Sequence, residues 1–164
     1  MEWGVVAGLE PRGFKWVIAG RLAVSERIGG HGFQHRRVRR EEEIIWLAAN
    51  GVNTVVSLLP GNQNQAAYEL AGFDYFNHAL VAGLEVGQIG EVFTVLDKAL
   101  VRSEAVALVH RDIIDDTVVG ILGGYLVHAG LIEDPILATS IIQEITGRAL
   151  GPEGRRLIPS SDGR

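Results

Sequence analysis

The residues best suited to chemistry lie in one short segment, residues 110–117, which reads His-Arg-Asp-Ile-Ile-Asp-Asp-Thr. Its imidazole and three carboxylates are donors that suit Zn, Mn or Fe, so one interpretation is a divalent-metal site at His110, Asp112, Asp115 and Asp116. No common metal-ligand spacing is present. Aspartate is also a good helix N-cap. We therefore favour a second interpretation, in which Asp115 or Asp116 caps a helix that begins at Thr117, and we expect no metal and no cofactor.

The elements around this segment predict where it lies in the fold. The apolar run 105–110 predicts a central strand, and residues 117–129 predict the helix that follows. Strands are also expected at 15–19, 53–59 and 74–78, and helices at 41–50, 65–71, 86–102 and 135–146. Strands that alternate with helices predict an α/β fold, with a central, mostly parallel sheet flanked by helices. Segment 110–117 then lies at the carboxyl end of a central strand.

Length and composition set limits on the class of protein. The chain has 164 residues and 47% hydrophobic residues, which predicts a single domain over 1–150 followed by a polar, flexible tail over 151–164. The net charge of −5 gives no general attraction to nucleic acid. No apolar run approaches the ~20 residues that span a bilayer. The first residues lack the features of a signal peptide, so we expect a cytoplasmic protein. There is no cysteine, which excludes disulfides and thiol nucleophiles.

Four segments of the sequence share a pattern with one enzyme family. They are residues 11–23 (Pro-Arg-Gly-Phe-Lys-Trp-Val-Ile-Ala-Gly-Arg-Leu-Ala), 47–58 with its Val-Val-Ser-Leu strand, 71–78, and the segment that begins at His110. Together, in this order, they resemble the small cysteine-dependent dual-specificity and tyrosine phosphatases. The resemblance implies the fold of that family, a mostly parallel sheet flanked by helices, with a phosphate-binding loop at the carboxyl end of a strand.

The resemblance also shows what is missing, because the family's loop reads His-Cys-x-x-Gly-x-x-Arg-Ser/Thr. Its cysteine attacks phosphorus, and its arginine holds two phosphate oxygens. Aligned on His110, Arg111 takes the cysteine position and Thr117 the arginine position. Aligned instead on Asp115-Asp116-Thr117, the loop is one residue short and Asp116 replaces the arginine. Residues 113 and 114 are both isoleucine, where the family's loop carries its glycine.

The family's third catalytic group is an aspartic acid on a separate loop, which protonates the leaving oxygen. Here that loop would follow His78, and its only acid is Glu85. The three aspartates of segment 110–117 would also repel a dianion. The resemblance therefore implies a pseudophosphatase, a catalytically inactive member of the family. Its degenerate phosphate loop comprises His110, Arg111, Asp112, Ile113, Ile114, Asp115, Asp116 and Thr117, and we expect no catalytic residues.

Residues 31–40 form a basic cluster that contains His35, Arg36, Arg37, Arg39 and Arg40. Such a cluster suits an acidic partner, a lipid headgroup or nucleic acid. The alternative, which we favour, is a solvated loop whose arginines pair with Glu41, Glu42 and Glu43. The cluster is still the best candidate in the sequence for an interaction surface.

The leading hypothesis is thus a binding or regulatory module that interacts with another protein. One alternative is a metal-dependent hydrolase that uses Asp112, Asp115 and Asp116. A second alternative is a structural subunit of a larger assembly, with the apolar helices over 117–146 as an interface that would also allow a homo-oligomer. The sequence identifies neither the partner nor the pathway, and it predicts no nucleic acid and no membrane span.

Overall fold

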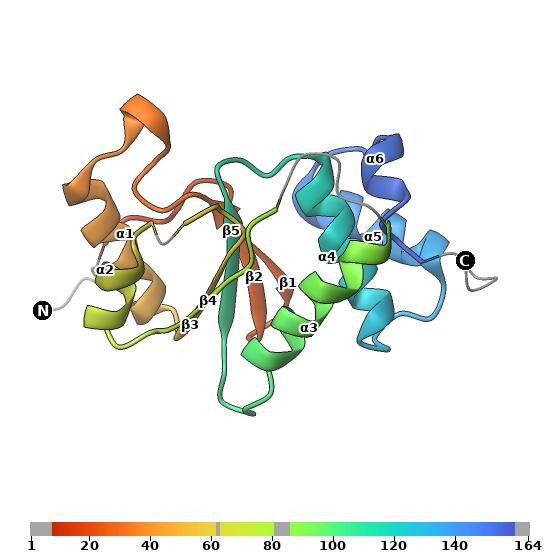
Figure 1. Ribbon diagram of the computed structural model, residues 1–164, viewed down its shortest axis with the longest axis horizontal. Helices are drawn as coiled ribbons and strands as arrows, with labels where there is room; N and C mark the ends of the chain where they lie inside the picture. Colours follow the sequence, from red (N-terminus) through yellow and green to blue (C-terminus); the bar gives the residue numbers. More distant parts are fainter. Residues whose placement is uncertain (1–7, 62, 81–85, 160–164) are drawn as a thin grey trace, which may run out of the picture.

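A computed structural model of the protein describes residues 8–61, 63–80 and 86–159, and within them five strands form one sheet (Figure 1). The strands lie in the order β1-β2-β5-β3-β4. β1 runs antiparallel to β2, and every other neighbouring pair is parallel. The predicted α/β fold with a mostly parallel sheet is therefore confirmed. The strand bounds are β1 (Lys15–Ile18), β2 (Leu22–Glu26), β3 (Thr54–Ser57), β4 (Asp74–Asn77) and β5 (Ala107–Arg111).

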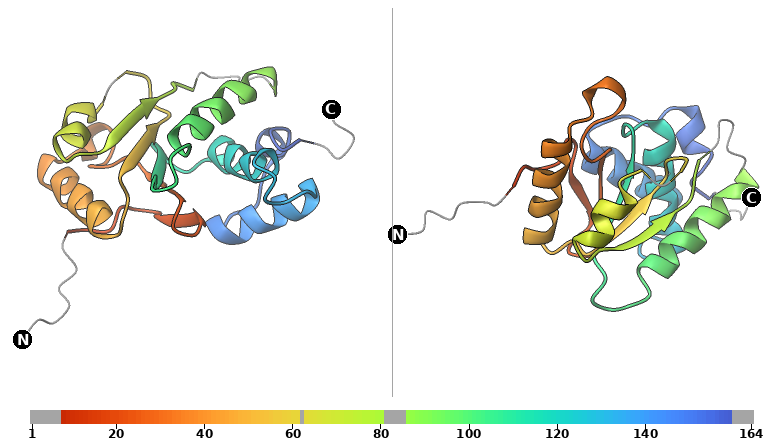
Figure 2. Two further views of the ribbon diagram at one scale, coloured as in Figure 1. Left: turned by 90° about the horizontal axis from the view of Figure 1, so that it is seen from below. Right: turned by 60° about the vertical axis from the view of Figure 1, so that its left-hand side comes forward.

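Helices cover both faces of the sheet (Figures 1 and 2). One layer contains α1 (Arg37–Ala49) and α2 (Gln65–Leu70), and the other contains α3 (Ile89–Ala99), α4 (Asp116–His128), α5 (Pro135–Thr146) and α6 (Pro152–Arg155). Short 3-10 turns, η1 (Gly32–Gln34) and η2 (Val86–Gln88), precede α1 and α3. Alternate residues of β5 enter the two cores: Leu108 packs with the α1–α2 layer, and Val109 packs with the α3–α6 layer. In the described part of the chain, no helix has the length and apolar character that crossing a bilayer requires.

β2 is the element that the sequence analysis did not predict, since no strand was expected between the one at 15–19 and the one at 53–59. The strand lies beside β5 over its whole length, from Leu22 opposite Ala107 to Glu26 opposite Arg111. Before it, Arg21 donates hydrogen bonds to the carbonyls of Leu100 (2.7 Å) and Ala105 (2.8 Å), which ties the β1–β2 hairpin to the turn that precedes β5.

α1 begins at Arg37, four residues before the predicted start at Glu41. Part of the basic cluster is therefore the first turn of a helix and not a loop. Positive charge at a helix N-terminus opposes the helix dipole. Two pairs four residues apart offset this effect, because Arg37 Nε lies 3.0 Å from Glu41 Oε1 and Arg39 Nε lies 3.2 Å from Glu43 Oε2.

The segment that follows residue 150 is folded, so the prediction of a flexible tail is wrong for residues 151–159. Pro152–Arg155 form α6, and Leu157 and Ile158 are buried in the core of the α3–α6 layer. Gly120 of α4 lies against Gly154 so closely that a Cβ atom on Gly120 would be 2.3 Å from the Gly154 carbonyl oxygen. The last five residues of the chain, 160–164, lie outside the described part.

Candidate functional site

The degenerate phosphate loop connects the carboxyl end of β5, the middle strand of the sheet, to the start of α4 (Figure 1). In open α/β sheets, ligands bind at this edge because the loops after parallel strands converge there. The structure therefore places the predicted segment where a ligand site is expected. The polar groups of this loop bind other groups of the same chain.

His110 is a buried structural residue. Its side chain is fully buried, and its Nε2 atom lies 3.1 Å from the hydroxyl of Tyr68 on α2. Burial, together with the positive charge of Arg27, lowers the pKa of His110 to about 3. The imidazole is therefore neutral near pH 7, and a group that is fully buried does not contact solvent or a ligand in solution.

Arg111 and Asp115 neutralise each other at the entrance to α4. Arg111 Nη1 lies 3.0 Å from Asp115 Oδ2. The other carboxylate oxygen, Oδ1, accepts a hydrogen bond of 3.0 Å from the backbone N–H of Val118, which makes Asp115 the N-cap of the helix. A helix N-terminus and a guanidinium group are the features that bind anions, and here both are bound to a carboxylate of the chain itself.

Asp116 points away from the loop and binds α6. Its Oδ1 accepts a hydrogen bond from the N–H of Gly151 (2.6 Å), and its Oδ2 accepts one from the N–H of Gly154 (2.7 Å). One carboxylate thus satisfies two amides at the N-terminus of α6 and holds that helix against α4. No signal in the sequence indicates this role, because the partner amides lie 35 and 38 residues further along the chain.

The remaining loop residues also have defined neighbours. Asp112 Oδ1 lies 3.6 Å from Arg27 Nη1. The carbonyl of Ile114 accepts a hydrogen bond of 2.7 Å from Arg148, and the Ile114 side chain packs against the core. Ile113 is about half exposed, and Thr117 is partly buried as the second residue of α4.

The four residues considered as metal ligands do not face one another. His110 is buried beside Tyr68, and Asp112 pairs with Arg27. Asp115 caps α4, and Asp116 binds α6. Within residues 8–61, 63–80 and 86–159, no group of three or more His, Cys, Asp or Glu side chains is arranged to hold a metal ion. Glu85, the only acid where the family has its general acid, lies outside the described residues.

The five residues of the basic cluster have different environments. Arg39 is tied to the buried Glu43, whose other oxygen accepts a hydrogen bond from the N–H of Gly29, so this pair holds the loop before α1. Arg36 donates to the carbonyls of Phe33 and His35, and Arg37 pairs with Glu41.

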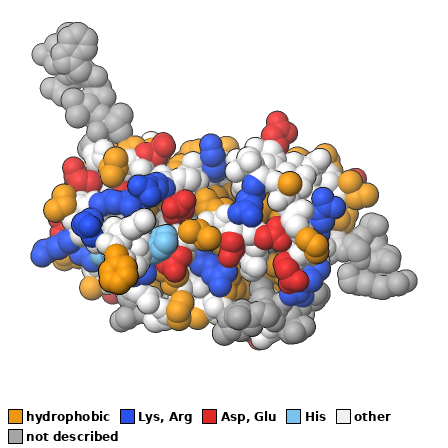
Figure 3. Space-filling model, turned by 90° about the horizontal axis from the view of Figure 1, so that it is seen from above, with side chains coloured by type: hydrophobic (Ala, Val, Ile, Leu, Met, Phe, Trp, Pro, Cys, Tyr) orange, Lys and Arg blue, Asp and Glu red, His pale blue; other side chains and the backbone are white. Residues whose placement is uncertain are grey.

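The other two members of the cluster are partly buried. Arg40 Nη1 donates a hydrogen bond of 3.3 Å to Asn64 Oδ1, and His35 lies before α1. Figure 3 shows Lys and Arg side chains gathered, beside hydrophobic ones, at the end of the molecule that carries α1.

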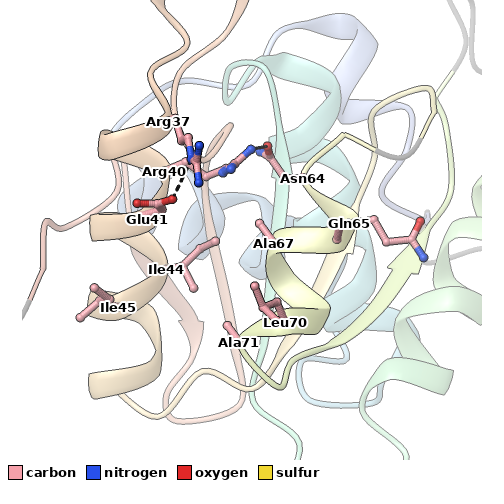
Figure 4. A pocket seen from close by; sticks show the side chains of 11 residues that line it. Arg37, Arg40, Glu41, Ile44, Ile45, Asn64, Gln65, Ala67, Leu70 and Ala71 are labelled. Carbon is pink, nitrogen blue, oxygen red and sulfur yellow. Dashed lines mark hydrogen bonds and ion pairs between the residues drawn. The ribbon is translucent and has the colours of Figure 1, made fainter.

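The structure adds one feature that the sequence did not indicate, an open groove between α1 and α2 with a volume of about 690 Å³ (Figure 4). The basic cluster contributes Arg37 and Arg40 to one end of this groove, and none of its lining residues belongs to the degenerate phosphate loop. Two of its lining residues, Ile45 and Leu70, are apolar residues on the exposed sides of their helices.

Comparisons of sequence identify no relative of this chain: no protein-family model matches it, and neither does any curated protein.

Comparisons of structure are more informative, because several solved phosphatases share the fold. Kinase associated phosphatase (KAP), solved with a substitution of its catalytic cysteine to serine, superposes with a TM-score of 0.70 at 12% identity, covering 90% of this chain and 92% of that one. Tk-PTP in its active form gives 0.65 at 16% identity, covering 89% and 92%. Human DUSP28 gives 0.60 at 18% identity, covering 90% of each chain. The chain therefore has the fold of dual-specificity and tyrosine phosphatases, and it has no cysteine.

Proposed function

We propose that this chain is a catalytically inactive phosphatase-like protein, a pseudophosphatase, that serves as a binding and regulatory module for another protein of the cytoplasm. One observation carries the proposal. At the start of α4, where phosphatases of this fold bind phosphate, the backbone N–H of Val118 and the Arg111 guanidinium are both bound to the carboxylate of Asp115. A fixed carboxylate in this place competes with the anion that the enzyme would have to bind.

The chemistry of the loop supports the same conclusion. Phosphoryl transfer through a covalent intermediate needs an activated nucleophile, and the chain has no cysteine. The three aspartates of the loop add negative charge, of which Arg111 and Arg27 offset part. A phosphate dianion would therefore meet like charges, and it would find the Val118 N–H and the Arg111 guanidinium already bound to Asp115.

A direct assay tests the inactivity. We expect the purified protein to turn over p-nitrophenyl phosphate, phosphotyrosine peptides and phosphoserine peptides no faster than buffer does, in the presence of either a chelator or added divalent metals. A matched control is the variant Arg111→Ala, whose turnover of the same substrates should also be no faster than that of buffer. Turnover that persists in the chelator and disappears in variants of residues 110–117 would overturn the proposal.

The metal-dependent hydrolase is the alternative that this assay also addresses. Turnover that requires a divalent metal and disappears in both Asp112→Asn and Asp115→Asn would favour it. The geometry supports it less, because Asp115 and Asp116 direct their oxygens to backbone amides of α4 and α6. The structural subunit remains a further proposal, and its signature would be a stable oligomer of the purified chain.

A further inference from the structure

The groove between α1 and α2 is apolar along most of its length. Ile44 is buried at its base, and Ala67 contributes from α2. Ile45 of α1 and Leu70 of α2 also line it and are 45% and 92% exposed. The volume of about 690 Å³ is in the range of sites that bind ligands in proteins. Aliphatic side chains with this exposure, on both walls of one groove, form a surface that an apolar partner would cover.

One end of the groove is polar and positive (Figure 4). Arg37 and Arg40 lie there on α1 beside Glu41, which pairs with Arg37, and Asn64 and Gln65 lie there at the start of α2. Both helices run in the same direction, from this end toward the apolar end (Figure 4). The groove therefore has the N-termini of two helices at its positive end, although α2 is too short to have a strong dipole.

The positive charge at this end is not fully compensated within the chain. α1 has neither a side-chain cap nor an acidic residue in its first turn. By contrast, the N-termini of α4 and α5 are capped by Asp115 and Asp134. Among residues 8–61, 63–80 and 86–159, Arg40 forms no ion pair, and its guanidinium donates to the neutral amide of Asn64. A carboxylate that binds here would meet an uncapped helix and an unpaired cation.

We propose that this groove binds a short amphipathic helix of a partner protein, with carboxylates in the last turn of that helix. The helix would lie antiparallel to α1, with its apolar side chains between Ile45 and Leu70. Its carboxylates and the negative end of its dipole would then lie at Arg40, beside the Arg37–Glu41 pair. This inference rests on the proposed function, since it names the surface and the partner class of the binding module.

The occupant follows from matching chemistry along the groove. An apolar stretch needs aliphatic or aromatic side chains at helical spacing, which is the usual mode of helix-in-groove recognition. A positive end needs an anion, and the carboxyl end of a helix with Asp or Glu supplies one. A peptide of about 12 residues forms a helix of about 18 Å, which is comparable with the 13 residues of α1.

A displayed peptide library tests the proposal on the full chain. Each peptide has apolar residues at positions i, i+3, i+4 and i+7, and its other positions vary among Asp, Glu, Lys, Arg, Ser and Ala. We expect selected binders to be enriched in Asp and Glu in the last turn. Moving the acidic residues of a binder to its first turn should weaken binding about tenfold, because the carboxylates would leave the positive end.

Two variants locate the binding. Leu70→Ser should weaken a selected peptide about tenfold without unfolding the protein, because Leu70 is exposed. Its matched control is Ile136→Ser, an exposed aliphatic residue on α5, which should leave binding unchanged. Arg40→Gln should weaken the acidic peptides, and its matched control, Lys98→Gln on α3, should not.

Several results would overturn the inference. These are a library without binders, binders without acidic enrichment, and binding that survives Leu70→Ser. A dimer of the purified chain that Leu70→Ser dissociates would assign the groove to a second copy. Binding to phosphatidylserine vesicles that Arg40→Gln and Leu70→Ser abolish, without peptide binding, would assign it to a lipid surface. Phosphatase turnover would contradict the proposed function but not the groove, since the assay and the peptide measurement are independent.

Discussion

Arg111 at the end of β5 and Asp115 at the N-cap of α4 face each other across the loop between them, with Nη1 and Oδ2 3.0 Å apart, and the same carboxylate accepts the N–H of Val118. The helix N-terminus is thus capped and neutralised from within the chain. A phosphate loop combines two properties. One is the shape that a strand, a loop and a helix provide, and the other is the positive potential that an anion needs. In this protein the strand–loop–helix shape is kept, but Asp115 neutralises the positive potential of Arg111 and of the helix N-terminus.

Replacing Asp115 by serine should restore anion binding, because serine still caps the helix while its loss of charge frees Arg111. We expect inorganic phosphate to stabilise Asp115→Ser but not the wild-type protein. Phosphate at ten times its Kd would contribute about 1.4 kcal/mol, which raises the Tm by about 3–6 °C for a domain of this size. The measurement is thermal unfolding at increasing phosphate, with Asp134→Ser at the N-cap of α5 as control. Equal stabilisation of the wild-type protein would contradict the prediction.

Removing the Asp116 carboxylate should release α6 from α4. Asp116→Ala leaves the N–H groups of Gly151 and Gly154 without their acceptor, and we expect a loss of about 2–3 kcal/mol in the free energy of unfolding. Urea unfolding measures this loss. Asp134→Ala is the matched control, because Asp134 caps α5 with one hydrogen bond to Ile136, and it should lose about 1 kcal/mol. Equal losses in the two variants would argue against a special role for Asp116.

His110 should make the protein sensitive to acid. Burial lowers the pKa of His110 to about 3, below the value of about 6.5 in the unfolded chain. Between these values the unfolded state binds a proton that the folded state does not, so stability falls as the pH falls below about 6.5, by up to about 1.4 kcal/mol per pH unit. The contribution is fully present above pH 6.5.

The test of this dependence is urea unfolding of the wild-type protein and of His110→Gln over a series of pH values. The variant is expected to be less stable at neutral pH, because it loses the contact with Tyr68, but its stability should fall less steeply as the pH decreases. The difference between the two slopes isolates His110 from the other titrating groups, which both proteins share. Parallel slopes would show that His110 does not carry this sensitivity.

Replacing each of two helical glycines by alanine should change the stability of the protein in opposite directions. Gly120→Ala places a Cβ atom 2.3 Å from the carbonyl oxygen of Gly154, so α6 must move, and we expect a loss of about 2–3 kcal/mol. Gly90→Ala on α3 meets no atom of the described residues within 4 Å, and it should gain about 0.5–1 kcal/mol from helix propensity. Thermal unfolding compares the two. A neutral Gly120→Ala would mean that α6 is not closely packed on α4.

The sequence predicted the elements whose local signals agree with their tertiary surroundings. β3 is a β-branched run between glycines, and α5 begins with Asp134 before Pro135, so both were expected close to their observed bounds. β2 was missed because its run, Leu22–Glu26, is short and follows a turn, and its partner β5 lies far away in sequence. α1 was predicted to start too late because the arginines of its first turn oppose the dipole, and only pairing with Glu41 and Glu43 offsets them.

The candidate site was predicted in part for a similar reason. The position of segment 110–117 after a central strand follows from the order of elements, and an aspartate cap on α4 follows from residue type. The partners of the side chains do not follow, because Asp116 binds amides of α6, and His110 contacts Tyr68, 42 residues away. The groove was missed because it depends on two helices from separate crossovers lying side by side.

The strand order also has a consequence for the synthesis of the chain on the ribosome. β5 lies between β2 and β3, yet it is the last of the five strands in sequence. Before residue 111 emerges, the β1–β2 hairpin and the β3–β4 pair cannot join, and each keeps an open edge beside unburied aliphatic side chains. Pairing across about 85 residues, as between Leu22 and Ala107, is entropically slow. During synthesis the two parts of the sheet therefore stay separate for a long interval. Chaperones would be needed most during this interval.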